Sequence, residues 1–274
     1  MKKHLWMLTV FLIGFATTGV FADVKTNLKR KTITNGEVTF VTGKQVRFLH
    51  RTFPDCNLLA KLIPVTFLTN GGQWFTIAYP DGTPEIIEEK GLKGFQISRK
   101  TSFGECSIKI LMPATGAFIL LRFNYKNITP VSTVAGSIPS IDFPEEFVKF
   151  SVNGQERVAS KVLQNEKNNI TKITSYAAFS TENATQPAVM MIIPDLAQLD
   201  FTAGGKITAG GCKRGYGWYP GSNVTHSDFV DNDLSANTNV VMDVILAAVT
   251  PDKVYSEIAT KALEFYKKFK INGK

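Results

Sequence analysis

The segment Ala117–Tyr125, AFILLRFNY, decides the fold class. Its first five residues are apolar without interruption before Arg122, whereas a strand with one solvated face alternates apolar and polar side chains. A short continuous apolar run is typical of a central strand that is covered on both faces. The segment therefore predicts a β-sheet with packed layers on both sides.

Three hairpin signals surround this strand. In each, an Asn-Gly turn separates two runs rich in Val, Phe, Thr and Ile, which is the strongest short-range pattern for a β-hairpin. In the first, Asn35 and Gly36 are expected to supply the two positive φ angles of a type I′ turn. The three segments are Thr32–Val41 around Asn35-Gly36, Val65–Tyr79 around Asn70-Gly71-Gly72, and Phe147–Ser160 around Asn153-Gly154.

Further segments extend the β pattern. Asn239–Val249, NVVMDVILAAV, fits either a strand with one outward carboxylate at Asp243 or a helix buried nearly all round, and its Val and Ile content favours the strand. The other strand candidates are Gly94–Arg99, Cys106–Leu111, Ile170–Ser180 and Ala188–Ile193. We predict a mainly β fold of antiparallel, sandwich-like sheets built from hairpins, with α+β as the alternative.

A helix is predicted at the C-terminus. Thr250 is expected to cap it and Pro251 to occupy its first position, where no backbone hydrogen bond is lost. We expect one apolar face to pack on a sheet, although a basic amphipathic helix at a membrane surface or partner would share the pattern. The apolar positions are Val254, Ile258, Ala262, Phe265 and Phe269.

Residues 1–22 resemble a secretory signal peptide. Lys2 and Lys3 precede an apolar stretch, and small residues lead to an expected cleavage after Ala22. The alternative is an uncleaved anchor. Cleavage would remove the two lysines, lower the net charge from +8 to +6, and leave no transmembrane segment, since no later uncharged apolar run approaches the roughly 20 residues that a bilayer requires. We expect a periplasmic or extracellular protein.

The composition is that of a globular protein. With 44% hydrophobic and 20% charged residues, intrinsic disorder, a coiled coil and a collagen-like repeat are excluded. Three prolines between residues 128 and 144 favour neither strand nor helix. We therefore predict a β-rich lobe at 23–129, a linker or crossover at 130–144 and a second lobe at 145–274 that ends in the helix, or a single domain over 23–274.

Cysteine and histidine usage indicates no metal site and no cofactor. Cys56 and Cys106 are the favoured disulfide pair, although three buried thiols would also fit the odd cysteine count. After residue 22 only His50 and His226 remain, and no pair of cysteines has zinc-binding spacing. Asn-x-Thr triplets occur at Asn127, Asn169, Asn183 and Asn223, which a eukaryotic secretory pathway could glycosylate.

The strongest candidate contact surface is the glycine-rich segment 203–221. Its glycines allow close approach of a ligand, its aromatic rings could stack on sugars, and its cations could hold acidic groups. The alternative is a surface loop whose aromatic side chains pin it to the core. The candidate ligand-binding residues are Lys206, Arg214, Tyr216, Trp218 and Tyr219, with His226 just downstream.

These observations predict an exported binding or envelope-associated protein without catalytic activity. Its expected ligand is a glycan or an anionic envelope component, and no base-stacking motif points to nucleic acid. The alternative is a secreted hydrolase acting on a glycan or similar polymer. No catalytic residue is assigned, because abundant carboxylates always permit pairs and His226 has no recognisable partners in the sequence.

Overall fold

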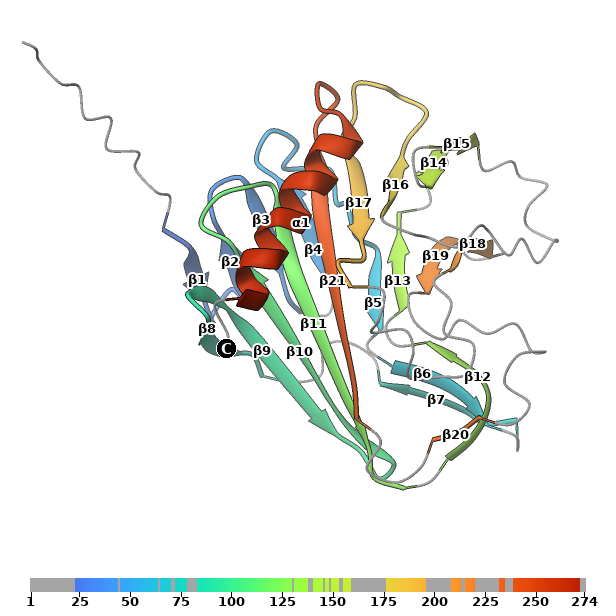
Figure 1. Cartoon of the computed structure of the whole chain (residues 1–274). Coiled ribbons are helices and arrows are strands. Elements are labelled where there is room, and N and C mark those ends of the chain that lie inside the picture. Colours follow the sequence, from blue (N-terminus) through green and yellow to red (C-terminus); the bar gives the residue numbers. More distant parts are fainter. Residues whose placement is uncertain are drawn as a thin grey trace, which may run out of the picture.

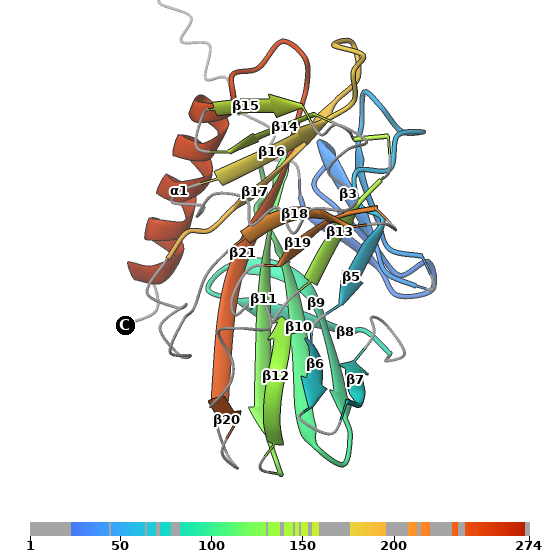
Figure 2. The same ribbon diagram turned by 90° about the vertical axis from the view of Figure 1, so that its right-hand side faces the viewer.

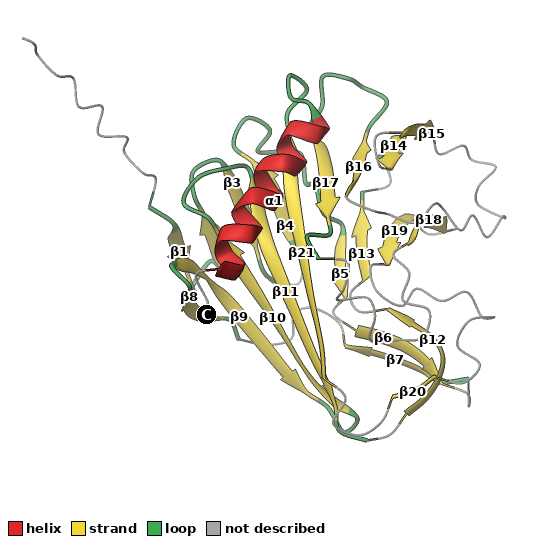
Figure 3. Ribbon diagram, viewed as in Figure 1, coloured by secondary structure: helices red, strands yellow, loops and turns green. Residues whose placement is uncertain are grey.

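The computed structural model describes residues 23–43, 45–63, 65–69, 72–77, 83–129, 131–137, 140–144, 146–147, 149–152, 155–158, 176–195, 208–212, 215–219, 232–234 and 239–271. Strands dominate this part of the chain, and α1 (Tyr255–Ile271) is the single helix within it (Figure 3). The predicted mainly β class with a C-terminal helix is confirmed. The expected signal peptide lies outside the described residues.

A nine-stranded antiparallel sheet forms the centre of the molecule. β11 lies in its interior between β10 and β21, as AFILLRFNY predicts, and residues Phe118–Leu121 are all buried. Asn239–Val249 is a strand, as its Val and Ile content indicated. In spatial order the sheet contains β15 (Gln155–Val158), β14 (Lys149–Val152), β16 (Tyr176–Ser180), β17 (Ala188–Ile192), β21 (Asn239–Val249), β11 (Phe118–Asn127), β10 (Gly104–Met112), β9 (Leu92–Lys100) and β8 (Glu85–Glu89).

Three smaller antiparallel sheets complete the β structure. The first contains β1 (Lys25–Asn27), β2 (Thr32–Thr34), β3 (Val38–Val41) and β4 (Arg47–His50). The second contains β20 (Asn232–Leu234), β12 (Val131–Ser137), β6 (Val65–Thr69) and β7 (Trp74–Ile77). The third contains β18 (Thr208–Cys212), β19 (Gly215–Tyr219), β13 (Ser140–Phe143) and β5 (Lys61–Ile63).

The large sheet separates two hydrophobic clusters. On one face α1 runs diagonally across the strands (Figure 1), and Ala262 and Phe269 pack with residues such as Leu120 and Ile245. On the other face the β1–β4 sheet contributes Phe40 and Phe48 to the second cluster. Figure 2 shows the helix on one side of the large sheet and β3 on the other. The first half of β11, Phe118–Leu121, is therefore covered on both faces, as predicted.

All three predicted hairpins form, but the turn of the first differs from the prediction. The hairpins are β2–β3, β6–β7 and β14–β15. Gly36 has a φ of 87°, whereas Asn35 does not take a positive φ, so the turn is not type I′. Instead, Asn35 Oδ1 accepts the backbone N–H groups of Glu37 and Val38, and its Nδ2 donates to two carbonyls of the β10–β11 connection. Tertiary hydrogen bonds thus decide this turn.

The proline-containing stretch 130–144 forms strands, contrary to prediction. β12 lies between Pro130 and Pro139, and β13 lies between Pro139 and Pro144. Pro144, the described one of the three prolines, directly follows the last residue of β13, where a missing N–H costs no ladder hydrogen bond. The nine-stranded sheet also takes strands from both expected lobes. The division into two lobes and the single-domain alternative both stay predictions.

The helix starts later than the sequence predicted. The Lys253 N–H donates to the Thr250 carbonyl and closes a turn, and the helix begins at Tyr255. Val254, expected on the apolar face, is 55% exposed. The helix packs on the sheet through Ala259, Ala262, Tyr266 and Phe269, as expected. Among the described residues, no helix has the length and apolarity to cross a bilayer.

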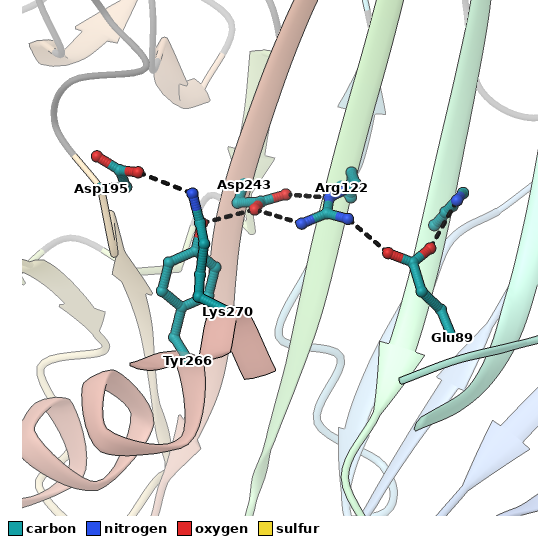
Figure 4. Close-up of polar contacts among 7 residues, drawn as sticks. Glu89, Arg122, Asp195, Asp243, Tyr266 and Lys270 are labelled. Carbon is teal, nitrogen blue, oxygen red and sulfur yellow. Dashed lines mark hydrogen bonds and ion pairs between the residues drawn. The ribbon is translucent and has the colours of Figure 1, made fainter. Parts of the chain in front are cut away.

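A buried polar network fastens the end of the helix to the sheet (Figure 4). Asp243 on β21 is only 2% exposed, and its two oxygens accept Nε and NH2 of Arg122 on β11 at 2.8 and 2.9 Å. The Tyr266 hydroxyl of α1 donates to Asp243 at 2.7 Å. Burial and the Asp243 carboxylate raise the pKa of Tyr266, and the bond to Asp243 raises that of Arg122.

Further charged residues surround the Arg122, Asp243 and Tyr266 contacts. Glu89 on β8 accepts from Arg122 NH1 at 2.5 Å and from Lys109 Nζ at 2.6 Å. At the helix end, Lys270 contacts Asp195 at 3.0 Å, and this pair is more exposed to solvent. Arg122 also lies 5.2 Å from the ring centroid of Phe269. The helix end is therefore held by charge, hydrogen bonds and apolar contact together.

Removing members of this network should destabilise the protein in a defined order. Asp243→Asn leaves the Arg122 charge poorly matched in a buried site and should lower the free energy of unfolding by about 3 kcal/mol. Tyr266→Phe loses a hydrogen bond to a charged group, about 1 to 2 kcal/mol. Lys270→Gln removes a surface pair and should cost less than about 1 kcal/mol. Urea unfolding measures all three, and a Lys270 effect equal to that of Asp243 would contradict this ranking.

Candidate ligand-binding site

A pocket of about 520 Å³ lies beside the first turn of α1. Its walls come from the end of β4, the β10–β11 connection, the end of β21 and the turn that precedes the helix. It is lined by Glu37, His50, Arg51, Thr52, Phe53, Gly116, Ala117, Phe118, Ala248, Thr250, Pro251, Asp252, Lys253, Ile258 and Lys261. Apolar side chains and charges of both signs therefore meet in one concavity.

Hydrogen bonds between the two sheets set the position of these walls. Gly116 donates its N–H to Glu37 Oε1 at 2.8 Å, and Asn35 Nδ2 donates to the Gly116 carbonyl at 2.9 Å. Gly116 has a φ of 102°, and a Cβ atom there would stand 2.6 Å from the ring of Phe118. Glycine is thus required at this corner, which joins the small sheet to the large one.

His50 is a buried histidine in the pocket wall. It is 7% exposed, and its Nδ1 accepts the Thr52 N–H at 3.2 Å. Burial, followed by the positive charge of Arg51, lowers the pKa of His50 below 6.5, while Glu37 and Asp252 act in the opposite direction. The ring is therefore neutral at pH 7. With Nδ1 accepting, the proton of the neutral ring lies on Nε2, which is a donor.

The turn before the helix supplies a fixed ion pair. Asp252 and Lys253 contact each other at 2.8 Å, and Thr250 Oγ1 donates to the Asp252 carboxylate. Hydrogen bonds from Lys253 and then Thr250 lower the pKa of Asp252 to about 2. The carboxylate is thus ionised throughout the neutral range. Arg51 and Lys261 also line the pocket, and neither forms an ion pair within the described part of the chain.

None of the sequence-predicted ligand residues is among the described residues that line this pocket. Lys206, Arg214 and His226 fall outside the described residues. Tyr216, Trp218 and Tyr219 belong to β19, an interior strand of its sheet rather than a loop, and only their backbone is described. Trp218 pairs with Ile141 and Tyr216 with Phe143 in the strand register. A ligand-binding role for these residues stays a prediction.

The predicted Cys56–Cys106 disulfide is wrong: both thiols are free in the structure. Cys106 lies near the start of β10, opposite Arg99 and Tyr125, whereas Cys56 lies in the connection after β4 and packs against the core. A disulfide requires the two Cα atoms within about 7 Å, and the fold gives the thiols separate surroundings. Burial raises the pKa of Cys106 to about 12 and also raises that of Cys56.

Two of the Asn-x-Thr triplets can be judged from the structure. Asn127 is completely buried; it accepts the Tyr125 hydroxyl at 2.8 Å and donates to the Thr129 carbonyl at 2.6 Å. A glycan on Asn127 is incompatible with this folded structure. Asn183 lies exposed in the β16–β17 turn. Asn169 and Asn223 lie outside the described residues.

The pocket residues carry no local sequence signal. His50, Phe53, Asp252 and Lys261 belong to no motif, and they meet only because the small sheet, the β10–β11 corner and the helix start converge. Long-range hydrogen bonds such as Asn35 to Pro113 create this convergence. In the described ranges no group of three or more His, Cys, Asp or Glu side chains is arranged to hold a metal ion.

No protein-family model matches the sequence, and no curated protein matches it. Solved structures match in fold. An α-mannosidase from Enterococcus faecalis has a TM-score of 0.55 at 10% identity, over 88% of this chain and 32% of that protein. A variant of the GH36 α-galactosidase AgaA from Geobacillus stearothermophilus, in complex with stachyose, has a TM-score of 0.50 at 12% identity, over 80% of this chain and 40% of that protein.

The GH36 α-galactosidase AgaB from the same organism has a TM-score of 0.49 at 10% identity, over 83% of this chain and 41% of that protein. At such low identity the likeness concerns the fold alone. The chain therefore spans 32 to 41% of the length of these enzymes and shares the fold of a part of the first two.

The titration of His50 is predicted to be shifted to low pH. Nuclear magnetic resonance should give it a midpoint below 6.5, in contrast to a solvent-exposed histidine. Because the unfolded chain binds the proton at higher pH than the folded one, stability should fall as pH decreases through 6.5 toward the folded pKa. His50→Gln should remove this part of the pH dependence. A midpoint above 6.5 would show that His50 is not desolvated.

The free thiols give a separate test. In the folded protein, Cys106 should resist a thiol reagent at about pH 8, because its thiolate fraction is very small and the side chain is buried. After unfolding in denaturant without reductant, Cys56 and Cys106 should both react. Mass spectrometry of the labelled peptides reads out each site, and a disulfide-linked Cys56–Cys106 peptide would contradict the structure.

Proposed function

We propose that this protein is an exported binding protein that holds a saccharide of one or two rings in the pocket beside α1 and does not transform it. The observation that carries the proposal is the composition of that pocket: an apolar, aromatic lining together with a rim of both carboxylates and cations. Ligand pockets commonly combine such a lining with a few convergent polar groups.

The lining suits the apolar side of a sugar ring. Phe53 is half-buried, and its ring lies 6.2 Å from that of His50. Phe118 stands edge-on to Phe265 at 5.2 Å, which fixes its orientation. Aromatic side chains offer broad apolar surface at little conformational cost. A pyranose could therefore place its C–H face against Phe53 with the ring already held in position.

The rim suits the hydroxyl groups. A sugar hydroxyl donates one hydrogen bond and accepts others, so it is best held between a carboxylate and a cation. Glu37 and Asp252 are available acceptors, Arg51 and Lys261 are donors, and His50 adds a neutral donor at Nε2. The volume of about 520 Å³ lies within the usual range for small-molecule sites.

Two further observations support a glycan ligand. The fold is like that of parts of an α-mannosidase and of an α-galactosidase in complex with stachyose. Residues 1–22 have the pattern of a secretory signal, which supports a periplasmic or extracellular location where glycans and anionic envelope components are exposed. We therefore propose such a glycan or envelope component as the partner.

A secreted hydrolase is the second candidate, because two carboxylates and a histidine line the same pocket. Glycoside hydrolysis by paired carboxylates needs one of them protonated as the general acid. The pKa of Asp252 is lowered to about 2, so Asp252 cannot fill that role at neutral pH. Glu37 Oε1 already accepts the Gly116 N–H. This arrangement favours binding over catalysis.

A glycan array with the purified protein tests the proposal. Against the best saccharide, Phe53→Ala should weaken binding by about three- to tenfold through loss of ring contact, and Phe53→Leu should weaken it less. Lys261→Ala should also weaken it. Lys267→Ala, an equal change at an exposed position of the same helix outside the pocket, is the matched control.

Three outcomes would count against the proposal. Absence of binding to every saccharide would refute it, and binding that none of the pocket variants affects would place the ligand elsewhere. Release of free sugar from the bound saccharide, abolished by Glu37→Gln, would favour the hydrolase instead.

A further inference from the structure

The helix side of the large sheet continues beyond the last turns of α1, and no described element covers it there (Figure 1). Asp243 points to this side, because its carboxylate contacts Tyr266 of the helix. Side chains two residues apart on a strand share a face, so the residues at positions 241 and 239 of β21 lie on the same side. The strand registers place two more cross-strand rows on it. We call these rows the polar face: Ser98, Ser107, Asn124 and Val241, then Lys100, Glu105, Lys126 and Asn239.

The polar face is hollowed rather than flat. Apart from Val241 its residues line a depression of about 420 Å³, to which Arg99 and Cys106 also contribute. Ser107 and Glu105 are half-buried at its base, and Asn124 and Lys126 are exposed. Because four paired strands carry these side chains, their backbone positions are fixed by the ladder hydrogen bonds. The depression is thus a preformed surface.

The charge of the depression is positive. Arg99, Lys100 and Lys126 line it together with a single carboxylate, Glu105. Glu105 pairs with Lys100 at 2.5 Å, whereas Lys126 has no ion-pair partner in the part of the chain that the structure describes. Lys126 stands directly across from Glu105 in the register. An occupant with negative charge would complement this surface.

Of the four neutral polar side chains of the polar face, only Ser98 has a hydrogen bond among the described residues, accepted from Gln96 Nε2 at 3.3 Å. Within the described residues, the side chains of Ser107, Asn124 and Asn239 form no hydrogen bonds. They lie on neighbouring strands, roughly 4.8 Å apart across the sheet and roughly 6.6 Å apart along it. A polymer whose hydroxyl groups recur at short intervals could engage several of them at once.

These features indicate which class of ligand the polar face suits. The residues of the polar face include no aromatic side chain on which a nucleic-acid base could stack. Val241, 40% exposed, is its single apolar member, whereas protein interfaces have an apolar core. Hydroxyls, amides and an excess of cations instead suit a polymer that is both hydroxylated and acidic.

We infer that the polar face binds a strand of acidic polysaccharide, with acidic groups near Lys126 and hydroxyls against Ser107, Asn124 and Asn239. This surface is separate from the saccharide pocket. Lys126 lies eight residues after Phe118 of the pocket along β11, a distance of about 26 Å. The inference therefore does not rest on the proposed function of the pocket.

Affinity electrophoresis of the whole protein in gels containing polygalacturonate, with dextran as the neutral polymer, tests this inference. The protein should be retarded by polygalacturonate and not by dextran, and raising salt from about 50 to about 200 mM should weaken the retardation. Lys126→Glu should reduce affinity by about tenfold or more through like-charge repulsion. Asn124→Ala should reduce it about two- to fivefold at unchanged net charge.

Lys268→Glu, the same charge change on an exposed helix position, is the matched control and should alter affinity less than about twofold. Two outcomes would overturn the inference in favour of unspecific electrostatic attraction. One is an equal loss of affinity in Lys268→Glu, and the other is displacement of polygalacturonate by single-stranded DNA at equal charge concentration. Absence of retardation would refute it. The unfolding midpoint of each variant shows whether it is folded. The two sites are distinguished on the glycan array, where Phe53→Ala should weaken saccharide binding and Lys126→Glu should not.

Discussion

The bidentate pair between Arg122 and Asp243 is the constraint on which the rest of the structure depends. The Asp243 carboxylate is only 2% exposed and requires the positive charge of Arg122 beside it, because an unpaired charge at a buried position is strongly unfavourable. A one-residue slip of β21 against β11 would turn Asp243 to the opposite face of the sheet. The pair therefore fixes the register of the two central strands.

The same carboxylate positions the helix. Tyr266 contacts Asp243, so a shift of α1 by one turn would leave a buried hydroxyl and a buried carboxylate short of a partner. With its end fixed there, the helix starts beside His50 and stops before the Ser107 row. The two candidate binding surfaces thus lie at opposite ends of one element, one enclosed and of mixed charge, the other open and positive. We propose a saccharide ligand for each of them.

Local patterns in the sequence predicted much of the fold. The uninterrupted run before Arg122, the three Asn-Gly turns and the Val-rich stretch through Asp243 all depend on neighbouring residues, and the strands they predict are present. The failures involve distant contacts. Asn35 bonds to a connection 78 residues away, and Cys56 and Cys106 remain apart. The pocket could not be predicted for the same reason, because His50 and Asp252 belong to no sequence motif and come together only when the sheets assemble.

The position of β21 in the chain has a consequence for biogenesis. It pairs with β17 on one side and β11 on the other, so it joins two half-sheets although it follows every other described strand in sequence. Until it arrives, β11 and β17 each present an open edge, and unpaired edges invite association with other chains. When the chain is synthesised from its N-terminus, these edges therefore stay open until residues 239–249 are available, and chaperones would be needed most during that interval.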